Sequence, residues 1–212
     1  MTGARFVRPN MSIARKCKGV AKIWRNRNAI RRFLEFCESL DASYSGSVQP
    51  LELEFLRELV MLANSFPGEI IEVGTLFGFT TQQLAIWKRS DKPLTTIDNF
   101  SWNPIGMPDS AHRAFTSRNL WYLTQRLNVK LFAGTSADYY SRFVGEKPAM
   151  IFIDDGHAYE EVMVDIRWAV QMKIPIICGH DYSESHTGVV RAVDETFGGS
   201  KKVVGSLWAH IL

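Results

Sequence analysis

Residues 69–81, Glu-Ile-Ile-Glu-Val-Gly-Thr-Leu-Phe-Gly-Phe-Thr-Thr, constrain the fold of this chain more than any other stretch. The apolar, β-branched run at 70–73 is typical of a strand that is buried on both faces. Two glycines, Gly74 and Gly78, follow it, and a run compatible with a helix extends over 80–88. Strand, glycine turn and helix together form the opening unit of a doubly wound α/β domain.

The spacing in this stretch is Glu-x-Gly-x-x-x-Gly, formed by Glu72, Gly74 and Gly78. A dinucleotide-binding turn has the spacing Gly-x-Gly-x-x-Gly and places a pyrophosphate against a helix N-terminus. Here the strand end carries a carboxylate, which would repel a phosphate and attract a cation. The pattern therefore disfavours a nicotinamide-dependent oxidoreductase.

The stretch resembles the first motif of the class I S-adenosylmethionine-dependent methyltransferases. That resemblance implies that the acidic residue and the glycines hold the methionine moiety and the sugar of S-adenosylmethionine. The alternative is a generic strand, turn and helix with a surface glutamate. The cofactor-binding residues implied here and at later strand ends are Glu72, Gly74, Thr75, Phe77, Gly78, Thr80, Asp98, Asn99, Ser136 and Asp154.

The length of 212 residues suits one domain with a single large core. Hydrophobic residues make up 46% of the chain, but no apolar run approaches the ~20 residues of a membrane span. The beginning of the chain lacks the uninterrupted apolar segment of a signal peptide. The three cysteines form neither a disulfide framework nor a zinc motif, which indicates a reducing compartment and a cytoplasmic protein.

The formal net charge of +3 hides an asymmetry, because residues 1–34 contain ten Lys/Arg and no Asp/Glu. Apolar positions recur at three- and four-residue steps over 11–40, which predicts one interrupted helix or two short ones. We therefore expect a basic helical extension at 1–48 and an S-adenosylmethionine-binding domain at 49–212. The basic segment 11–34 could contact an anionic membrane surface at its cytoplasmic side, bind a polyanion, or cover the edge of the domain with a solvated face.

Further elements follow the first motif in alternation. A proline and two acids predict a helix that begins at Pro50 and ends near Ala63. The whole pattern predicts a Rossmann-like sheet, mostly parallel, with a terminal antiparallel hairpin. The expected strands are 94–97, 129–133, 149–153 and 174–179, the expected helices are 111–127, 137–143 and 189–197, and the hairpin is 202–212.

Two of these strands end in groups suited to a nucleoside. Asp98 follows the second strand, and a carboxylate there can accept both ribose hydroxyls. Ser136 follows the third strand, where the resemblance implies a contact with adenine; a helix N-cap is the alternative. A long turn-rich insertion at 99–110 is expected to form the acceptor pocket, or else a surface loop with its own apolar cluster. Its exposed apolar residues are expected to be Phe100, Trp102 and Met107.

Acids and imidazoles end the next two strands. Asp154, Asp155 and His157 follow one, and His180 and Asp181 follow the other. Adjacent parallel strands lie about 4.8 Å apart, so the two groups should face one another beside the cofactor crevice. Two converging carboxylates can hold a divalent cation such as Mg²⁺, and a histidine can accept the proton of an acceptor hydroxyl.

The segments 152–159 and 179–182 resemble one branch of the class I methyltransferases. It includes macrolide-sugar and rhamnosyl O-methyltransferases and cephalosporin-hydroxylase-like proteins of methyltransferase family 24. The resemblance implies Mg²⁺ binding by Asp154 and Asp181 and a general base at His157, with His180 as the second candidate base. Metal-dependent members often have an acid where this chain has His180, a softer ligand, so the need for a metal stays open.

The sequence thus predicts a methyltransferase that uses S-adenosylmethionine and modifies a hydroxyl of a small molecule or sugar, such as a polysaccharide, a glycolipid or a glycosylated natural product. One alternative is a nucleic-acid methyltransferase that uses the basic segment. It is disfavoured because Ile153-Asp154-Asp155-Gly156 stands where an Asn/Asp-Pro-Pro-aromatic signature would lie. Another alternative is a non-catalytic binding or scaffolding protein. A homo-oligomer is compatible with the sequence.

Overall fold

The computed structural model describes Asn28 and residues 48–212. The chain divides into two units, of which one includes Pro104–Met107 and the other holds the described residues 48–103 and 108–212. The second unit carries the whole sheet and is described below. The basic segment lies outside the described residues, apart from Asn28, which is helical and exposed. The boundary at residue 48 and the membrane contact therefore stay predictions.

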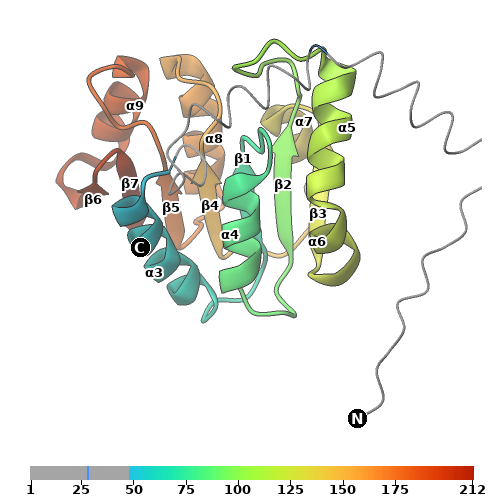
Figure 1. Ribbon diagram of the computed structural model, residues 1–212. Coiled ribbons are helices and arrows are strands. Elements are labelled where there is room, and N and C mark those ends of the chain that lie inside the picture. Colours follow the sequence, from blue (N-terminus) through green and yellow to red (C-terminus); the bar gives the residue numbers. More distant parts are fainter. Residues whose placement is uncertain (1–27, 29–47) are drawn as a thin grey trace, which may run out of the picture. The chain divides into compact units, whose positions relative to one another are not determined.

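Seven strands form one sheet in the described part of the chain (Figure 1). They are β1 (Ile70–Val73), β2 (Leu94–Asp98), β3 (Val129–Ala133), β4 (Met150–Ile153), β5 (Ile176–Gly179), β6 (Lys201–Val204) and β7 (Leu207–Ile211). Their order is β3-β2-β1-β4-β5-β7-β6. The first five of these strands run parallel, whereas β7 pairs antiparallel with both β5 and β6. This confirms the doubly wound Rossmann-like sheet with its terminal antiparallel hairpin.

Helices cover both faces of the sheet (Figure 1). They are α3 (Pro50–Ala63), α4 (Phe79–Trp87), α5 (Asp109–Asn119), α6 (Trp121–Arg126), α7 (Ser136–Ser141), α8 (Tyr159–Gln171) and α9 (Thr187–Phe197), with a short 3₁₀ helix at Gly198–Ser200. Residues of α3 and α4 pack on one face of the sheet, and residues of α8 and α9 on the other. The result is a three-layer α/β/α arrangement.

The central strands are apolar because each of their faces is covered. All four residues of β1, of β4 and of β5 are buried. Side chains alternate across the sheet, so Ile70 packs with α3 and α4 whereas Ile71 packs with α8 and α9. Burying an aliphatic side chain of this size stabilises the fold by roughly 1.5–3 kcal/mol. Glu72 interrupts this apolar run and is also fully buried.

One predicted helix differs from the structure. The periodicity over 111–127 predicts a single helix, but α5 and α6 are separate and meet at Leu120. The Leu120 side chain is fully buried and packs against Gly78, where an added Cβ would lie 2.6 Å from a Leu120 methyl carbon. Because Leu120 is apolar and continues the helical spacing, the sequence pattern does not distinguish this break from a continuous helix.

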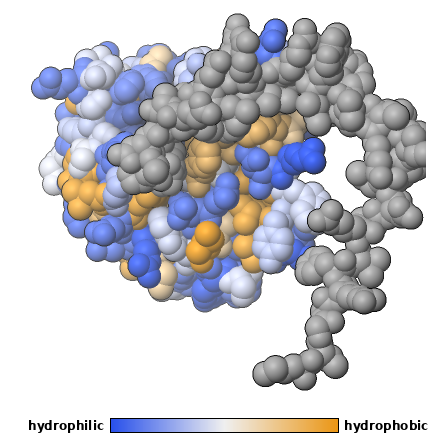
Figure 2. All heavy atoms as spheres, in the orientation of Figure 1, coloured by the Kyte–Doolittle hydropathy of each residue, from blue (hydrophilic) through white to orange (hydrophobic). Residues whose placement is uncertain are grey.

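The surface mixes polar and apolar side chains. Figure 2 shows hydrophobic side chains scattered among hydrophilic ones on the side that carries α3 and α4. Exposed apolar residues of these two helices include Leu51, Met61 and Ile86. Within the part that the structure describes, none of the helices combines the length and the apolarity that a membrane span requires.

Candidate active site

The loop after β1 passes close to the end of β4. Gly74 and Gly78 have φ values of 94° and 84°, which L side chains rarely adopt. A Cβ on Gly74 would also overlap the carbonyl oxygen of Asp154. The two glycines of the first motif are thus needed for backbone conformation and, at Gly74, for close approach. The strand order reverses between β1 and β4, and such a switch point is the usual ligand position in doubly wound folds.

Asp98 fixes the glycine loop from the end of β2. Its Oδ2 accepts a 2.7 Å hydrogen bond from the Leu76 N–H, and its Oδ1 accepts one of 2.6 Å from the Phe100 N–H. Leu76 and Phe100 both have positive φ, 47° and 62°. Each carboxylate oxygen can accept a second hydrogen bond, so ribose binding by Asp98 stays a prediction that these contacts allow.

Helix α5 holds the same loop from the other side. The Leu76 carbonyl lies 2.9 Å from His112 Nε2 and accepts a 2.5 Å hydrogen bond from the Thr116 hydroxyl. The Asn119 amide donates to the Phe77 carbonyl at 3.2 Å. His112 and Thr116 are fully buried. No sequence pattern predicted this support, because the three α5 residues lie about forty positions from the loop they contact.

Glu72 lies inside the protein rather than at an open strand end. Its Oε2 accepts a 2.5 Å hydrogen bond from Thr81 in α4. Burial raises the pKa of Glu72 to about 8 although hydrogen bonds from Thr81 and Thr96 oppose the rise. The side chain is therefore mostly protonated at neutral pH, whereas the sequence predicted a carboxylate that attracts a cation. Its part in cofactor binding stays a prediction.

The other predicted cofactor residues of the loop are also buried. Thr75 shares a 2.5 Å hydrogen bond with Thr96. Thr80 is buried in the first turn of α4, and the Phe77 ring packs edge-on against His112. These side chains are buried within and beside the loop, and their contact with the cofactor stays a prediction.

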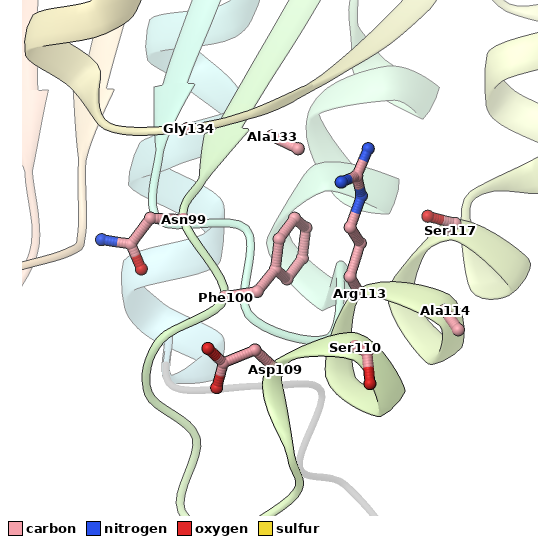
Figure 3. A pocket seen from close by; sticks show the side chains of 9 residues that line it. All are labelled: Asn99, Phe100, Asp109, Ser110, Arg113, Ala114, Ser117, Ala133 and Gly134. Atoms are coloured by element: carbon pink, nitrogen blue, oxygen red, sulfur yellow. The ribbon is translucent and has the colours of Figure 1, made fainter.

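A hollow of about 450 Å³ lies between the ends of β2 and β3 and the first turns of α5. Figure 3 shows Arg113 pointing along it towards Ala133, with the Phe100 ring beside it and Asn99 pointing away. Its lining residues are Asn99, Phe100, Asp109, Ser110, Arg113, Ala114, Ser117, Ala133 and Gly134. Asn99 was predicted as a cofactor residue, and its place at this hollow beside Asp98 is compatible with that role.

Two expectations were wrong, one about exposed residues in the insertion at 99–110 and one about Ser136 as a helix cap. Phe100 and Met107 are buried, whereas Trp102 is 67% exposed, so only Trp102 matches the predicted exposure. The N-cap of α7 is Thr135, whose hydroxyl accepts from the Asp138 N–H at 3.1 Å. Ser136 is the first residue of the helix, so its alternative role as the cap was wrong, and adenine contact stays a prediction.

Acids and imidazoles from β4 and β5 lie together as expected. His157 Nε2 lies 2.8 Å from Asp181 Oδ2, and His180 Nδ1 lies 3.3 Å from Asp181 Oδ1. His180 Nδ1 is also 3.6 Å from Asp154 Oδ1. His186, at the start of α9, approaches the same Asp181 oxygen at 3.7 Å. Asp155, in contrast, is exposed. The structure thus brings His157, His180, Asp154 and Asp181 into one cluster, and their chemical roles stay predictions.

His180 is enclosed by groups that the sequence analysis did not connect with it. Its Nε2 lies 3.0 Å from Glu52 Oε2 and 2.9 Å from the Ser206 hydroxyl. Only 6% of the residue is exposed. Burial alone would lower the pKa of His180, but the interactions with Asp154, Asp181 and Glu52 outweigh it and raise the pKa to about 11.

Asp181 responds in the opposite direction. Burial would raise its pKa, but His180, and then His157 and His186, lower the pKa of Asp181 to about 2. Its backbone has a φ of 60°, an αL conformation that an aspartate tolerates better than most residues. The carboxylate is therefore ionised across the physiological range and is presented to three imidazoles.

The cluster does not fit a magnesium ion bound by Asp154, His180 and Asp181. Mg²⁺ prefers oxygen ligands, and a ligating imidazole must offer a lone pair. Both nitrogens of His180 instead face carboxylate oxygens. Magnesium binding stays a prediction from the sequence, and the donor set speaks against it.

Helix α9 packs tightly on the segment that carries His157. A Cβ on Gly188, in the first turn of α9, would overlap the His157 carbonyl oxygen and lie 2.7 Å from the Tyr159 nitrogen. Since Gly188 has no side chain, the two backbones can meet there. The backbone of His157 is thus positioned by α9, and its side chain by Asp181.

Known structures share this fold. An O-methyltransferase from Bacillus cereus in complex with SAH has a TM-score of 0.61 at 19% identity, covering 88% of this chain and 91% of its own. The calicheamicin methyltransferase CalS11 has a TM-score of 0.64 at 14% identity, with the same coverage of 88% and 91%. TomG from Streptomyces achromogenes, an O-methyltransferase involved in tomaymycin synthesis, has a TM-score of 0.59 at 18% identity, covering 87% and 88%.

No curated protein matches the sequence. Residues 71–182, however, match the family 24 profile described as a methyltransferase domain. The match begins in β1 and ends just after His180 and Asp181, so it contains the glycine loop and the acid–imidazole cluster. It also spans more than half of the 212 residues. The chain therefore belongs to methyltransferase family 24 and is a class I S-adenosylmethionine-dependent methyltransferase.

Proposed function

We propose that this enzyme methylates a hydroxyl group of a small-molecule or sugar acceptor, with His157 as the general base. The observation that carries the proposal is the hydrogen bond of 2.8 Å between His157 Nε2 and Asp181 Oδ2. Among the similar structures, CalS11 is a TDP-rhamnose 3'-O-methyltransferase, which supports a sugar as one acceptor class.

The pair has the geometry of an oriented base. An ionised carboxylate can only accept hydrogen bonds, so Nε2 of His157 carries the proton and the lone pair lies on Nδ1. A neutral imidazole held in this tautomer can take a proton from an alcohol near neutral pH. The His157 side chain is 46% exposed, so an acceptor can reach it. Asp181 would orient the imidazole of His157 in the way that the aspartate of a catalytic triad orients its histidine.

The cofactor would lie at the carboxyl ends of β1 and β4, where the strand order reverses. When bound, S-adenosylmethionine would supply a methyl group on a positively charged sulfur. The acceptor oxygen would attack the methyl carbon and displace the sulfur. The backbone of the glycine loop at 74–78 would hold it, and Asp98 would accept its ribose hydroxyls. Asp98 is the last residue of β2 and Asp154 follows β4, the two strands that pair with β1, so two acidic side chains at this end of the sheet favour a cationic ligand.

Magnesium assistance is not part of the proposal, because both nitrogens of His180 face carboxylates. A nucleic-acid acceptor would depend on the basic segment 1–34, which, apart from Asn28, lies outside the described residues. No described contact favours it over a hydroxyl acceptor. A non-catalytic role is the other outcome of the test below.

The test combines turnover with cofactor binding. Methyl transfer from labelled S-adenosylmethionine would be measured on a panel of nucleotide sugars, glycosides and phenols, and S-adenosylhomocysteine binding by calorimetry. We expect His157→Gln to lower kcat at least about 100-fold and to leave the Kd for S-adenosylhomocysteine nearly unchanged. The matched control is His210→Gln, since His210 lies on β7 and stacks on Phe197.

Asp98→Ala tests the cofactor part separately. Loss of a carboxylate that accepts several hydrogen bonds should weaken S-adenosylhomocysteine binding by about tenfold or more. A wild-type protein that binds no S-adenosylhomocysteine would point to the non-catalytic alternative. If His157→Gln retains full turnover on an acceptor that the wild-type enzyme methylates, His157 is not the base.

A further inference from the structure

Three carboxylates surround the ring of His180. Glu52 Oε2 lies 3.0 Å from Nε2, whereas Asp181 Oδ1 and Asp154 Oδ1 lie 3.3 Å and 3.6 Å from Nδ1. These acids come from α3, from the end of β4 and from the residue after His180 itself. The ring thus stands between Glu52 on one side and the two strand-end carboxylates on the other.

Hydrogen bonding fixes the role of one ring nitrogen, Nε2. The Ser206 hydroxyl donates to Glu52 Oε1 at 2.9 Å, and the Ser206 N–H donates to the same oxygen at 2.6 Å. The remaining oxygen, Oε2, accepts from the Gln49 N–H at 2.7 Å and faces His180 Nε2. Since the hydroxyl proton of Ser206 is used, Nε2 meets only acceptors and must donate.

The other nitrogen, Nδ1, is buried and makes no hydrogen bond, but the groups nearest to it are the Asp154 and Asp181 carboxylates. These offer only acceptor oxygens when ionised, so their charges stabilise a proton on Nδ1. A ring protonated on both nitrogens carries a positive charge, and it has no lone pair to offer a metal. Glu52 and His180 are 4% and 6% exposed, so the pair is shielded from water and its attraction is little screened.

We infer that the His180 ring occupies the place of a divalent cation at this site, joining Asp154 to Asp181 so that the enzyme needs no metal ion. The inference rests on the proposed function, because it concerns the same cluster. It assigns Glu52 and Ser206 as positioning residues that hold the ring. Asp181 is then free to present its second oxygen, Oδ2, to His157.

The decisive measurement is metal binding rather than turnover. Wild-type protein would be dialysed against a chelator and titrated with MgCl₂ and MnCl₂ in a calorimeter, and its melting temperature would be recorded with each ion. We expect no saturable heat and no shift of the melting temperature, because an ion that does not bind the folded state does not stabilise it. Binding of one Mn²⁺ per chain that Asp154→Asn abolishes would overturn the inference.

A gain-of-function variant tests the same point in the other direction. Glu52→Gln combined with His180→Glu replaces the ring by a carboxylate and removes the acid that would otherwise lie unpaired beside it. We expect this double variant to bind one Mn²⁺ and to melt at a higher temperature when the ion is present. The matched control, Glu52→Gln with His180→Gln, lacks the third carboxylate and should bind Mn²⁺ more weakly.

Circular dichroism would establish that both double variants are folded. A folded Glu52→Gln/His180→Glu protein that binds no Mn²⁺ would contradict the idea that the ring stands in a cation position. Should that variant fail to fold, the wild-type titration decides alone. The outcome is separable from the proposed function, because a protein that transfers no methyl group would still give the same metal titration.

Discussion

Asp181 accepts a 2.8 Å hydrogen bond from His157 while its own backbone adopts a φ of 60°. Asp181 follows the last residue of β5 and contacts both His157 and His180, through different carboxylate oxygens. Asparagine tolerates the same conformation, which makes Asp181→Asn a substitution that tests chemistry rather than folding.

We expect Asp181→Asn to lower kcat by about 10²–10⁴-fold, because an amide donor can hold His157 in the wrong tautomer. The Kd for S-adenosylhomocysteine should change little, since the side chain of Asp181 contacts the imidazoles of His157, His180 and His186. Stopped-time methyl-transfer assays and calorimetry would measure the two quantities. Asp91→Asn, at an exposed pair with Arg89, is the control. A variant with wild-type kcat would show that Asp181 does not orient the base.

Gly188→Ala should reduce kcat about tenfold or more, because the added Cβ would displace the backbone of His157 and Tyr159. Elsewhere in a helix the same substitution would favour the helix. Gly199→Ala is the matched control, since a Cβ there meets nothing within 4 Å. Equal activity of the two variants would show that the contact between α9 and the His157 segment does not position the base.

Thr116→Val should lower the free energy of unfolding by about 1 kcal/mol and weaken S-adenosylhomocysteine binding. The substitution keeps the shape of the side chain but removes the hydroxyl that donates to the Leu76 carbonyl. Thr124→Val removes a comparable hydroxyl contact, to the Trp121 carbonyl, far from the loop. Urea unfolding and calorimetry would compare the two. Equal Kd values in both variants would separate α5 from cofactor binding.

Glu72 should make stability fall as the pH rises. Its pKa is raised from 4.5 to about 8 in the folded protein, so between these values the folded state binds a proton that the unfolded state has released. This contribution is full below about pH 4.5 and decreases by about 1.4 kcal/mol per pH unit up to about pH 8.

Glu72→Gln removes that dependence. We expect its melting temperature to exceed that of the wild type at pH 8, with a smaller difference at pH 5. Differential scanning calorimetry across this range would measure it, with exposed Glu54→Gln as the control. A difference that grows as the pH falls would have the wrong sign for a buried, protonated acid.

The sheet could be predicted from sequence because its signals are local. Apolar β-branched runs followed by glycine or acid residues gave each parallel strand to within about two residues at either end. The acid–imidazole cluster was also predictable, since neighbouring parallel strands place their carboxyl ends together. Periodicity failed at Leu120, where a core contact with Gly78 continues the helical spacing across a break.

Partners that meet only in the folded chain could not be predicted. Glu52 looked like an acid in the first turn of a helix, and its contacts with His180 and Ser206 span 128 and 154 positions. Phe100 sits in a polar, turn-rich segment that indicates exposure, yet its ring packs edge-on against buried His112. A local sequence pattern does not predict which distant residues will pack against a given side chain.

The hydrogen bonds from Ser206 to Glu52 join the start of α3 to the turn between β6 and β7. During synthesis this turn leaves the ribosome after every other element of the site. A growing chain that has reached Asp181 already contains His157 and His180, yet it lacks both Ser206 donors to Glu52 Oε1. Competence to methylate should consequently arise late, as the terminal hairpin docks.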